Sequence, residues 1–159
     1  MRVKKPLLNI VLYQPEIPPN TGNIIRLCAN TGATLHLICP LGFNLNEKEL
    51  RRAGLDYAEW ATVKTYADFD TFLQSEKPAR LFACSTKAKK YYTDARFEKG
   101  DYLLFGPESR GLPAELLARY SNILIRIPMR AESRSLNLSN AVAVITYEAL
   151  RQLKFIELK

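Results

Sequence analysis

Three polar segments of the chain carry the side chains that could do chemistry, and each follows a short apolar run. The segments read QPEIPPNTGN (14–23), GPESRGL (106–112) and PMRAESRSLNLSN (128–140). They are rich in arginine, amide and hydroxyl groups, which orient a substrate, donate hydrogen bonds and hold phosphate. Carboxylates that could do acid–base work are few in them. This set favours a reaction in which a cosubstrate already carries the activated group and the protein chiefly positions it.

Standard nucleotide, nucleophile and metal motifs are absent from the sequence. G-x-G-x-x-G does not occur, and GPESRGL has P-loop spacing but continues with Leu112 rather than with Lys and Ser or Thr. The one histidine, His36, lies between two leucines in a predicted strand, so no Ser-His-Asp triad can be built on it. The cysteines Cys28, Cys39 and Cys84 form no C-x-x-C pair and lie in apolar stretches. We therefore expect reduced cysteines, a cytoplasmic protein and no metal site.

Length and charge bound the class of protein. A chain of 159 residues, 47% hydrophobic and 25% charged, is typical of one soluble globular domain, which we expect to span residues 1–159. The net charge of +7 favours a polyanionic partner through phosphate contacts, although a basic protein without such a partner fits the charge alone equally well. No apolar run reaches the length of a membrane span, and no secretory signal is recognisable, so no membrane association is expected.

Short apolar runs alternate with longer amphipathic ones along the chain. Strands are predicted at residues 7–13, 34–39, 59–66, 80–85, 102–106 and 122–128, and helices at 20–32, 46–57, 68–76, 113–120 and 138–153. This alternation predicts an α/β fold with a mostly parallel sheet flanked by helices. Because ligands bind beyond the carboxyl ends of parallel strands, the three polar segments should meet at one edge of the sheet.

Two of the predicted helices carry features beyond a single buried face. Asn23, Arg26 and Asn30 share one side of the first helix, where they either bind phosphate near its N-terminus or simply face water. The last helix is apolar on two sides, one of which contains Tyr147. Such a helix is either buried within its own domain or shared with a partner, for which a symmetric dimer is the natural hypothesis. Tyr147 is then an interface residue or a core residue.

Read together, the segments PEIPPNTGNIIR, FGPESRGLP and IPMRAESRSLNLSNAVAVITYEALRQ resemble the three signature motifs of the SPOUT class of RNA 2′-O-methyltransferases. The resemblance covers residues 8–153 and is strongest to the short, single-domain tRNA (cytidine/uridine-2′-O)-methyltransferases of the TrmL type, which act at the wobble position. It implies S-adenosylmethionine as methyl donor, tRNA as substrate, a homodimer, and an α/β fold with a C-terminal deep trefoil knot.

The resemblance also implies roles for individual residues. Arg26, Asn20 and Asn137 would be catalytic, with Arg26 either removing the proton of the ribose 2′-hydroxyl or holding phosphate and stabilising the developing alkoxide. Glu108 and Asn137 would tie the knotted loops together or to the reacting groups. The cofactor pocket would contain Cys84, Gly106, Glu108, Ile127, Met129, Ser135 and Leu136. Exposed cations would hold the tRNA, with Arg51, Arg52, Lys87, Lys89, Lys90, Arg130 and Arg134 as candidates.

A glycine at position 106 has a physical explanation, since a side chain there would crowd an adenosine lying on the turn.

Two alternatives to the tRNA enzyme remain. One is a 2′-O-methyltransferase that acts on another RNA, and the other is a non-catalytic RNA-binding module of the same fold.

Overall fold

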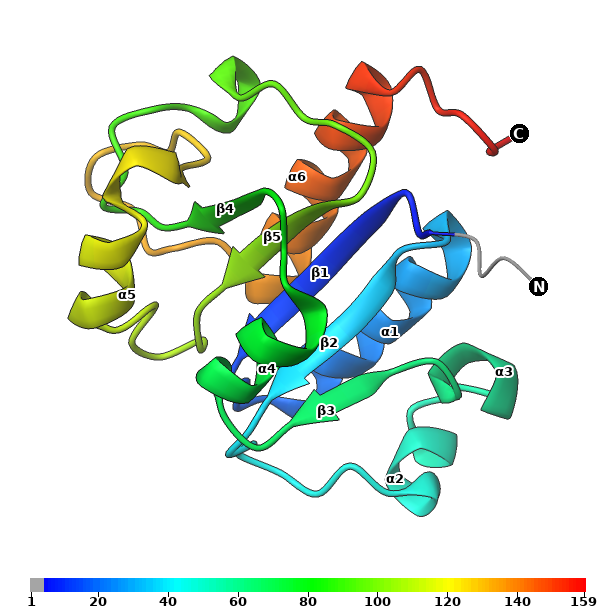
Figure 1. Ribbon diagram of the computed structural model, residues 1–159. Helices are drawn as coiled ribbons and strands as arrows, with labels where there is room; N and C mark the ends of the chain where they lie inside the picture. The colour runs from blue at the N-terminus through cyan, green and yellow to red at the C-terminus, as the bar shows by residue number, and fades with distance from the viewer. Residues whose placement is uncertain (1–4) are drawn as a thin grey trace.

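The structure, a computed structural model, describes residues 5–159 and contains one six-stranded parallel sheet (Figure 1). The strand order is β3-β2-β1-β5-β4-β6. The strands are β1 (Leu8–Tyr13), β2 (Thr34–Ile38), β3 (Lys64–Tyr66), β4 (Leu81–Cys84), β5 (Asp101–Phe105) and β6 (Leu124–Ile125). The helices are α1 (Pro18–Thr31), α2 (Glu47–Arg52), α3 (Tyr57–Trp60), α4 (Phe69–Glu76), α5 (Ala114–Arg119) and α6 (Leu138–Gln152), with 3₁₀ turns at Tyr92–Asp94 and Ser121–Ile123. The predicted parallel sheet flanked by helices is confirmed.

Helices cover both faces of the sheet, α1 and α6 on one side and α4 and α5 on the other (Figure 1). Side chains alternate along a strand, so Ile10 and Leu12 of β1 join the core under α1 and α6, whereas Val11 joins the core under α4 and α5. Burial on both faces explains why β1 reads as a nearly continuous apolar run. In the register, Leu12 pairs with Leu37 of β2 and Phe105 of β5, so the carboxyl ends of the three strands lie level.

Several predicted element boundaries are wrong for local reasons. Helix α1 begins at Pro18 rather than at Asn20, because two prolines occupy its first turn, where a missing N–H costs nothing. The predicted helix 46–57 ends at Arg52, and the predicted strand 59–66 is a strand only at Lys64–Tyr66. Its first part belongs to α3, which begins with a capping box between Asp56 and Glu59.

The chain between β6 and α6 passes between two parts of the segment that follows β4. The Ser85 amide donates to the carbonyl of Ile125 (2.9 Å), the Arg126 amide donates to the carbonyl of Lys90 (2.9 Å), and the Tyr92 amide donates to the carbonyl of Arg126 (2.8 Å). Residues 125–126 are therefore bonded on one side to the start of the 85–92 segment and on the other to its end. The predicted trefoil knot requires such an enclosure, and the knot itself stays a prediction.

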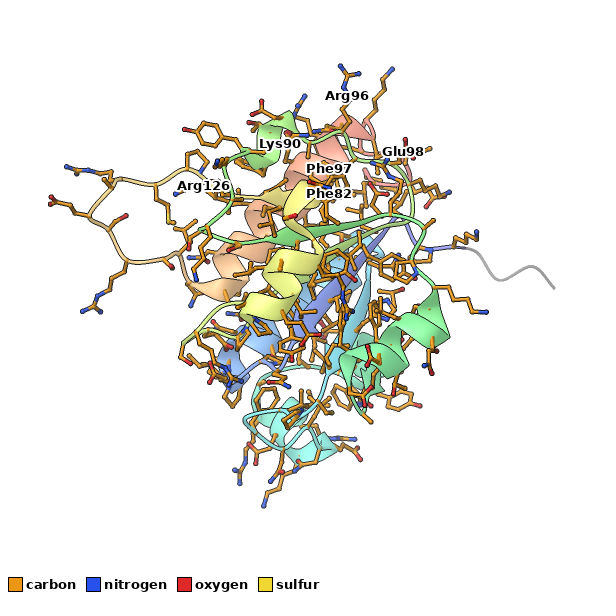
Figure 2. All side chains as sticks on the ribbon, turned by 60° about the vertical axis from the view of Figure 1, so that its left-hand side comes forward. Phe82, Lys90, Arg96, Phe97, Glu98 and Arg126 are labelled. Carbon is orange, nitrogen blue, oxygen red and sulfur yellow. The ribbon has the colours of Figure 1, made fainter. Side chains whose placement is uncertain are left out.

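The same segment closes over the end of α6. Phe97 lies next to Phe82 of β4 (Figure 2) and packs edge-on against it, with ring centroids 5.0 Å apart. Gln152 near the end of α6 accepts from the Phe97 amide (2.9 Å) and donates to the carbonyl of Ala95 (2.9 Å). These contacts fix α6 relative to β4, and so fix the position at which its N-terminus meets the strand ends.

The two sides of α6 have different surroundings. Val142, Ile145 and Ala149 are buried against the sheet and α1. Leu150 is also fully buried in the domain, so this part of the helix needs no partner to cover it. Tyr147 is 45% exposed, which rules out the alternative of a core tyrosine. One face of α6 thus presents large apolar atoms to solvent in the single chain.

Candidate active site

A cavity of about 510 Å³ lies beyond the carboxyl ends of β4, β5 and β6. The loops after these strands and the first turns of α6 form its walls. It is lined by every residue of the predicted cofactor pocket, together with two of the three predicted catalytic residues: Cys84, Gly106, Glu108, Ile127, Met129, Ser135, Leu136, Asn20 and Asn137. The prediction that the three polar segments meet at one edge of the sheet is confirmed.

The chemistry of the walls fits a nucleoside-sized ligand with a polar ribose. The volume falls within the range of about 300–1,000 Å³ common for small-molecule sites. Phe105, Ile127 and Ile145 supply apolar surface for a heterocycle, and Thr86 and Ser135 bring hydroxyl groups. The residues present therefore fit a cofactor such as S-adenosylmethionine.

Gly106 is required by the chain itself rather than by a ligand. A Cβ atom at this position would lie 2.3 Å from the Leu112 nitrogen and 2.4 Å from the carbonyl carbon of Gly111. The 106–112 loop folds back so tightly that only glycine fits at its start. Our explanation from crowding of an adenosine is thus corrected, because the first clash is with the protein's own backbone.

A chain of hydrogen bonds centred on Glu108 joins the three loops. One Glu108 oxygen accepts from the Glu16 amide (2.8 Å), and the other accepts from the Ile17 amide (2.7 Å) and from Nδ2 of Asn20 (3.2 Å). The Oδ1 atom of Asn20 in turn accepts from Nδ2 of Asn137 (2.9 Å). Glu108, Asn20 and Asn137 therefore tie the loop after β1, the loop after β5 and the start of α6 to one another.

Asn137 is fixed from both ends of its amide group. Its Oδ1 atom caps α6 by accepting from the Ser139 amide (2.9 Å), the Ser139 hydroxyl (2.6 Å) and the Asn140 amide (3.3 Å). Because Nδ2 donates to Asn20, the orientation of the Asn137 amide is determined without ambiguity. The polar sequence before α6 thus contains a helix N-cap that also carries the network across to α1.

A second bond between loops escaped the sequence analysis. The Glu16 carboxylate accepts from both the amide (2.8 Å) and the hydroxyl (2.7 Å) of Ser109. These two bonds hold the pKa of the Glu16 carboxyl below its usual value, with a smaller effect from the charge of Arg110. Glu16 of the loop after β1 thus accepts bonds from the loop after β5, and Glu108 of the loop after β5 accepts bonds from the loop after β1. The only sequence signal for this contact was that both glutamates lie in the polar segments.

Arg26 does not line the cavity of its own chain. It lies on the exposed face of α1, as Asn23 and Asn30 do, with 49% of its side chain exposed. Its Nη2 atom donates to the carbonyl of Gly54 (2.7 Å), and its Nε atom forms an ion pair with Glu59. Of the three predicted catalytic residues, the structure brings Asn20 and Asn137 together and places Arg26 elsewhere.

Positive charge surrounds the mouth of the cavity. The loop between β6 and α6 stands out from the body of the protein (Figure 2), and Arg130 and Arg134 are exposed on it. Arg126, which we did not predict, lines the cavity at the root of this loop. Its buried Nε atom has no hydrogen-bond partner among the described residues. Arg126 was not among the predicted site residues because it falls within the predicted strand 122–128 rather than in one of the three polar segments.

Burial favours the neutral forms of His36, Cys28 and Cys84. His36 is fully buried in β2, bonded to the Tyr66 hydroxyl (2.9 Å) and to Oδ1 of Asn9 (3.0 Å), and burial lowers its pKa to about 4. Burial raises the pKa of Cys28 to about 12 and raises that of Cys84 as well, so the Cys84 thiol in the cavity wall is neutral. The strand position predicted for His36 is confirmed.

Within residues 5–159, no group of three or more His, Cys, Asp or Glu side chains is placed to hold a metal ion. None of the helices in this range combines the length and the apolar character that a membrane span requires.

Comparisons with known proteins give one consistent result. The model of the SpoU rRNA Methylase family matches residues 7–147. A protein of Saccharophagus degradans named tRNA (cytidine(34)-2′-O)-methyltransferase is 60% identical over 151 residues, which cover 94% of this chain and 97% of that protein. A solved structure described as "Structural insights into the 2-OH methylation of C/U34 on tRNA" is 52% identical, with a TM-score of 0.85 over 94% of this chain and 98% of that one. The SpoU methyltransferase AviRb of Streptomyces viridochromogenes, solved in complex with AdoMet, is 25% identical, with a TM-score of 0.79 over 96% of this chain and 63% of that one.

Proposed function

Because the chain belongs to the SpoU rRNA Methylase family, we propose that it transfers a methyl group from S-adenosylmethionine to a ribose 2′-hydroxyl of tRNA. The target is the cytidine or uridine at the anticodon wobble position, since relatives at 60–61% identity are named for cytidine 34 and the description of a solved structure at 52% identity names C/U34. One observation of the structure carries this proposal. A single cavity brings together Asn20, Glu108 and Asn137 through direct hydrogen bonds, next to walls that suit a nucleoside.

S-adenosylmethionine supplies the activated methyl group, and the protein's part is to bind and to position. Ile127, Met129 and Leu136 would enclose the adenosine, and Ser135 would bond its polar groups. Asn20 and Asn137 would set the position of the target ribose, because their amides are held by Glu108 and by the cap of α6. Such positioning supplies several kcal/mol of a transfer barrier when the reacting atoms are aligned.

Arg26 would act at the cavity of a second copy of the chain. Arg26 is exposed and lies outside the cavity of its own chain. Helices α1 and α6 cover the same face of the sheet, and α6 exposes the apolar side chains of Val144 and Tyr147 there. A twofold dimer through this face would cover the apolar atoms and carry α1 of each copy toward the other. Guanidinium groups are donors without an acceptor lone pair. We therefore assign Arg26 to holding phosphate and stabilising the developing alkoxide rather than to removing the proton.

The tRNA would contact exposed cations on the loop at the cavity mouth and on other parts of the surface. Every cation predicted to hold RNA is exposed: Arg51, Arg52, Lys87, Lys89, Lys90, Arg130 and Arg134. A tRNA substrate and three free cysteines fit the predicted cytoplasmic location.

Methylation of total tRNA and, in parallel, of ribosomal RNA with a labelled donor, followed by nucleoside analysis and position mapping, tests the proposal. The expected product is 2′-O-methylcytidine or 2′-O-methyluridine at the wobble position. Label that enters only ribosomal RNA, or a base nitrogen, would instead support a methyltransferase with another target. RNA binding without any transfer, combined with no calorimetric binding of S-adenosylmethionine at millimolar concentration, would identify a non-catalytic binding module.

A further inference from the structure

Arg26 is held by groups from the ends of two neighbouring helices. The carbonyl of Gly54, just after α2, accepts from Nη2 (2.7 Å), and the carboxylate of Glu59, in the first turn of α3, pairs with Nε. Nε and Nη2 form one edge of the guanidinium group, so both acceptors engage the same edge. The Nη1 end of the planar fork points away from them. We call Gly54 and Glu59 the Arg26 clamp.

Each half of the clamp is fixed by a local motif rather than by chance contact. Helix α2 ends in a Schellman motif, in which the Leu55 amide donates to the carbonyl of Leu50 (3.1 Å) and the Gly54 amide donates to that of Arg51 (3.0 Å). Gly54 has a φ of +82°, which glycine adopts without strain. The motif thereby aims the Gly54 carbonyl at α1.

Glu59 is held just as firmly by the capping box of α3. One carboxylate oxygen accepts from the Asp56 amide (3.0 Å), while the Asp56 side chain accepts from the Glu59 amide (3.0 Å). The other oxygen pairs with Arg26. Only 14% of the Glu59 side chain is exposed, compared with 49% for Arg26, so the carboxylate is the fixed member of the pair.

We propose that Glu59 is the positioning residue of Arg26 in methyl transfer, and this inference rests on the proposed function. A long exposed arginine loses rotamer freedom whenever it must meet a phosphate or an alkoxide. The clamp removes that freedom before the substrate arrives and presents the Nη1 end. A misplacement of about 1 Å at a reacting group can cost 10²-fold in rate. The contribution of Glu59 therefore falls on turnover, because its partner Arg26 is half exposed and an ion pair of this kind contributes little to stability.

The test is a double-mutant cycle on single-turnover rates, with Glu59→Gln, Arg26→Ala and the double variant. Glutamine keeps the carbonyl oxygen that the capping box needs at this position but replaces the charged partner of Arg26 with a neutral amide. Glu59→Asp retains the charge and withdraws it by one methylene group. Glu115→Gln, which removes the exposed partner of Arg119 on α5, serves as the matched control and should leave the rate unchanged.

We expect Glu59→Gln to lower the rate about 10- to 100-fold, with the KM for tRNA and the melting temperature close to wild type. Glu59→Asp should fall between the two, and Glu59→Gln should have no further effect once Arg26 is alanine. An unchanged or increased rate for Glu59→Gln, a rise in KM alone, or an equal loss in both backgrounds would overturn the inference. Wild-type protein that methylates no tRNA would refute the proposed function itself, and an active Arg26→Ala variant would remove the role assigned to Arg26.

Discussion

Replacement of Glu108 by glutamine should loosen the cavity, and the structure gives the size of the effect. One Glu108 oxygen accepts a single bond from the Glu16 amide, and the other accepts two, from the Ile17 amide and from Asn20. Glutamine has only one acceptor oxygen, which would best keep the position with two bonds. Its NH₂ group would then face the Glu16 N–H, so one donor would lose its partner and the other two bonds would lose the charge of the carboxylate.

The loss of one hydrogen bond to a charged group costs about 1.5–3 kcal/mol. Solvent reaches part of this network, so we take about 2 kcal/mol from within the range given for such bonds. With a urea dependence of about 2 kcal/mol per molar, the unfolding midpoint should fall by about 1 M. The variant and the wild type must be compared at one protein concentration, because association shifts apparent stability. The affinity for S-adenosylmethionine, measured by calorimetry, should fall as well.

Glu115→Gln is the control for this change. Its carboxylate is 79% exposed and pairs with Arg119, so its midpoint should stay within about 0.3 M of wild type, as is usual for surface substitutions. A Glu108→Gln midpoint indistinguishable from that of Glu115→Gln would refute the reasoning. It would mean that water replaces the carboxylate without loss and that the network does not hold the loops.

Further predictions concern the buried histidine, the tight turn and the charged surface. The pKa of His36 is lowered to about 4 in the folded chain against about 6.5 unfolded, so its contribution to stability is complete above pH 6.5 and is lost as the pH falls toward 4. Urea titrations should show that the wild type loses about 3 kcal/mol of unfolding free energy over this range and that His36→Gln does not. The same dependence of unfolding free energy on pH in both proteins would contradict this. Gly106→Ala should weaken S-adenosylmethionine binding at least about tenfold in calorimetry, because the added Cβ would lie 2.3 Å from the Leu112 nitrogen and overpacking of this kind costs about 1–3 kcal/mol. An affinity within twofold of wild type would show that the loop relaxes to accept the side chain. The affinity for tRNA should fall steeply with salt, and neutral replacements at Arg130 and Arg134 should reduce the slope of log K against log salt by about 1 to 2, whereas a flat response would exclude a phosphate-dominated surface.

The position of the cavity could be predicted from the sequence because it follows from the alternation of elements. Strands and helices in turn imply parallel strands, and parallel strands place their following loops at one edge. Asn20, Glu108 and Asn137 are 88 or more residues apart in two of their three pairings, yet each lies just after a strand or at the adjoining helix start. The resemblance to a family then implied roles for these three residues in the site. The structure adds which atoms bond, and it shows that both carboxylate oxygens of Glu108 accept hydrogen bonds from residues 16–20.

The Arg26 clamp could not be predicted from the sequence, because it forms where local motifs from separate segments of the chain meet in the fold. The pattern Asp56-x-x-Glu59 is a readable capping signal, but the stretch that follows resembled a strand and obscured it. Even with α3 recognised, nothing in the spacing relates Glu59 to Arg26, 33 positions earlier on a different helix. Gly106 illustrates the same limit, since a glycine can be predicted from a motif while its reason requires the position of Leu112.

The separation of Arg26 from the cavity of its own chain leads to a last prediction. If Arg26 completes the site of a partner subunit, a defect in the cavity and a defect at Arg26 should complement each other when they lie on different chains. A heterodimer of Arg26→Ala and Gly106→Ala subunits, coexpressed and purified through two different tags, would contain one site with an intact cavity and an intact arginine. At a donor concentration well below the Kd of the Gly106→Ala cavity, its activity should therefore reach about half that of the wild-type dimer, while each variant homodimer stays far less active. A heterodimer as inactive as the homodimers would place Arg26 in the cavity of its own chain, and the separation between them would then have to close when substrate binds.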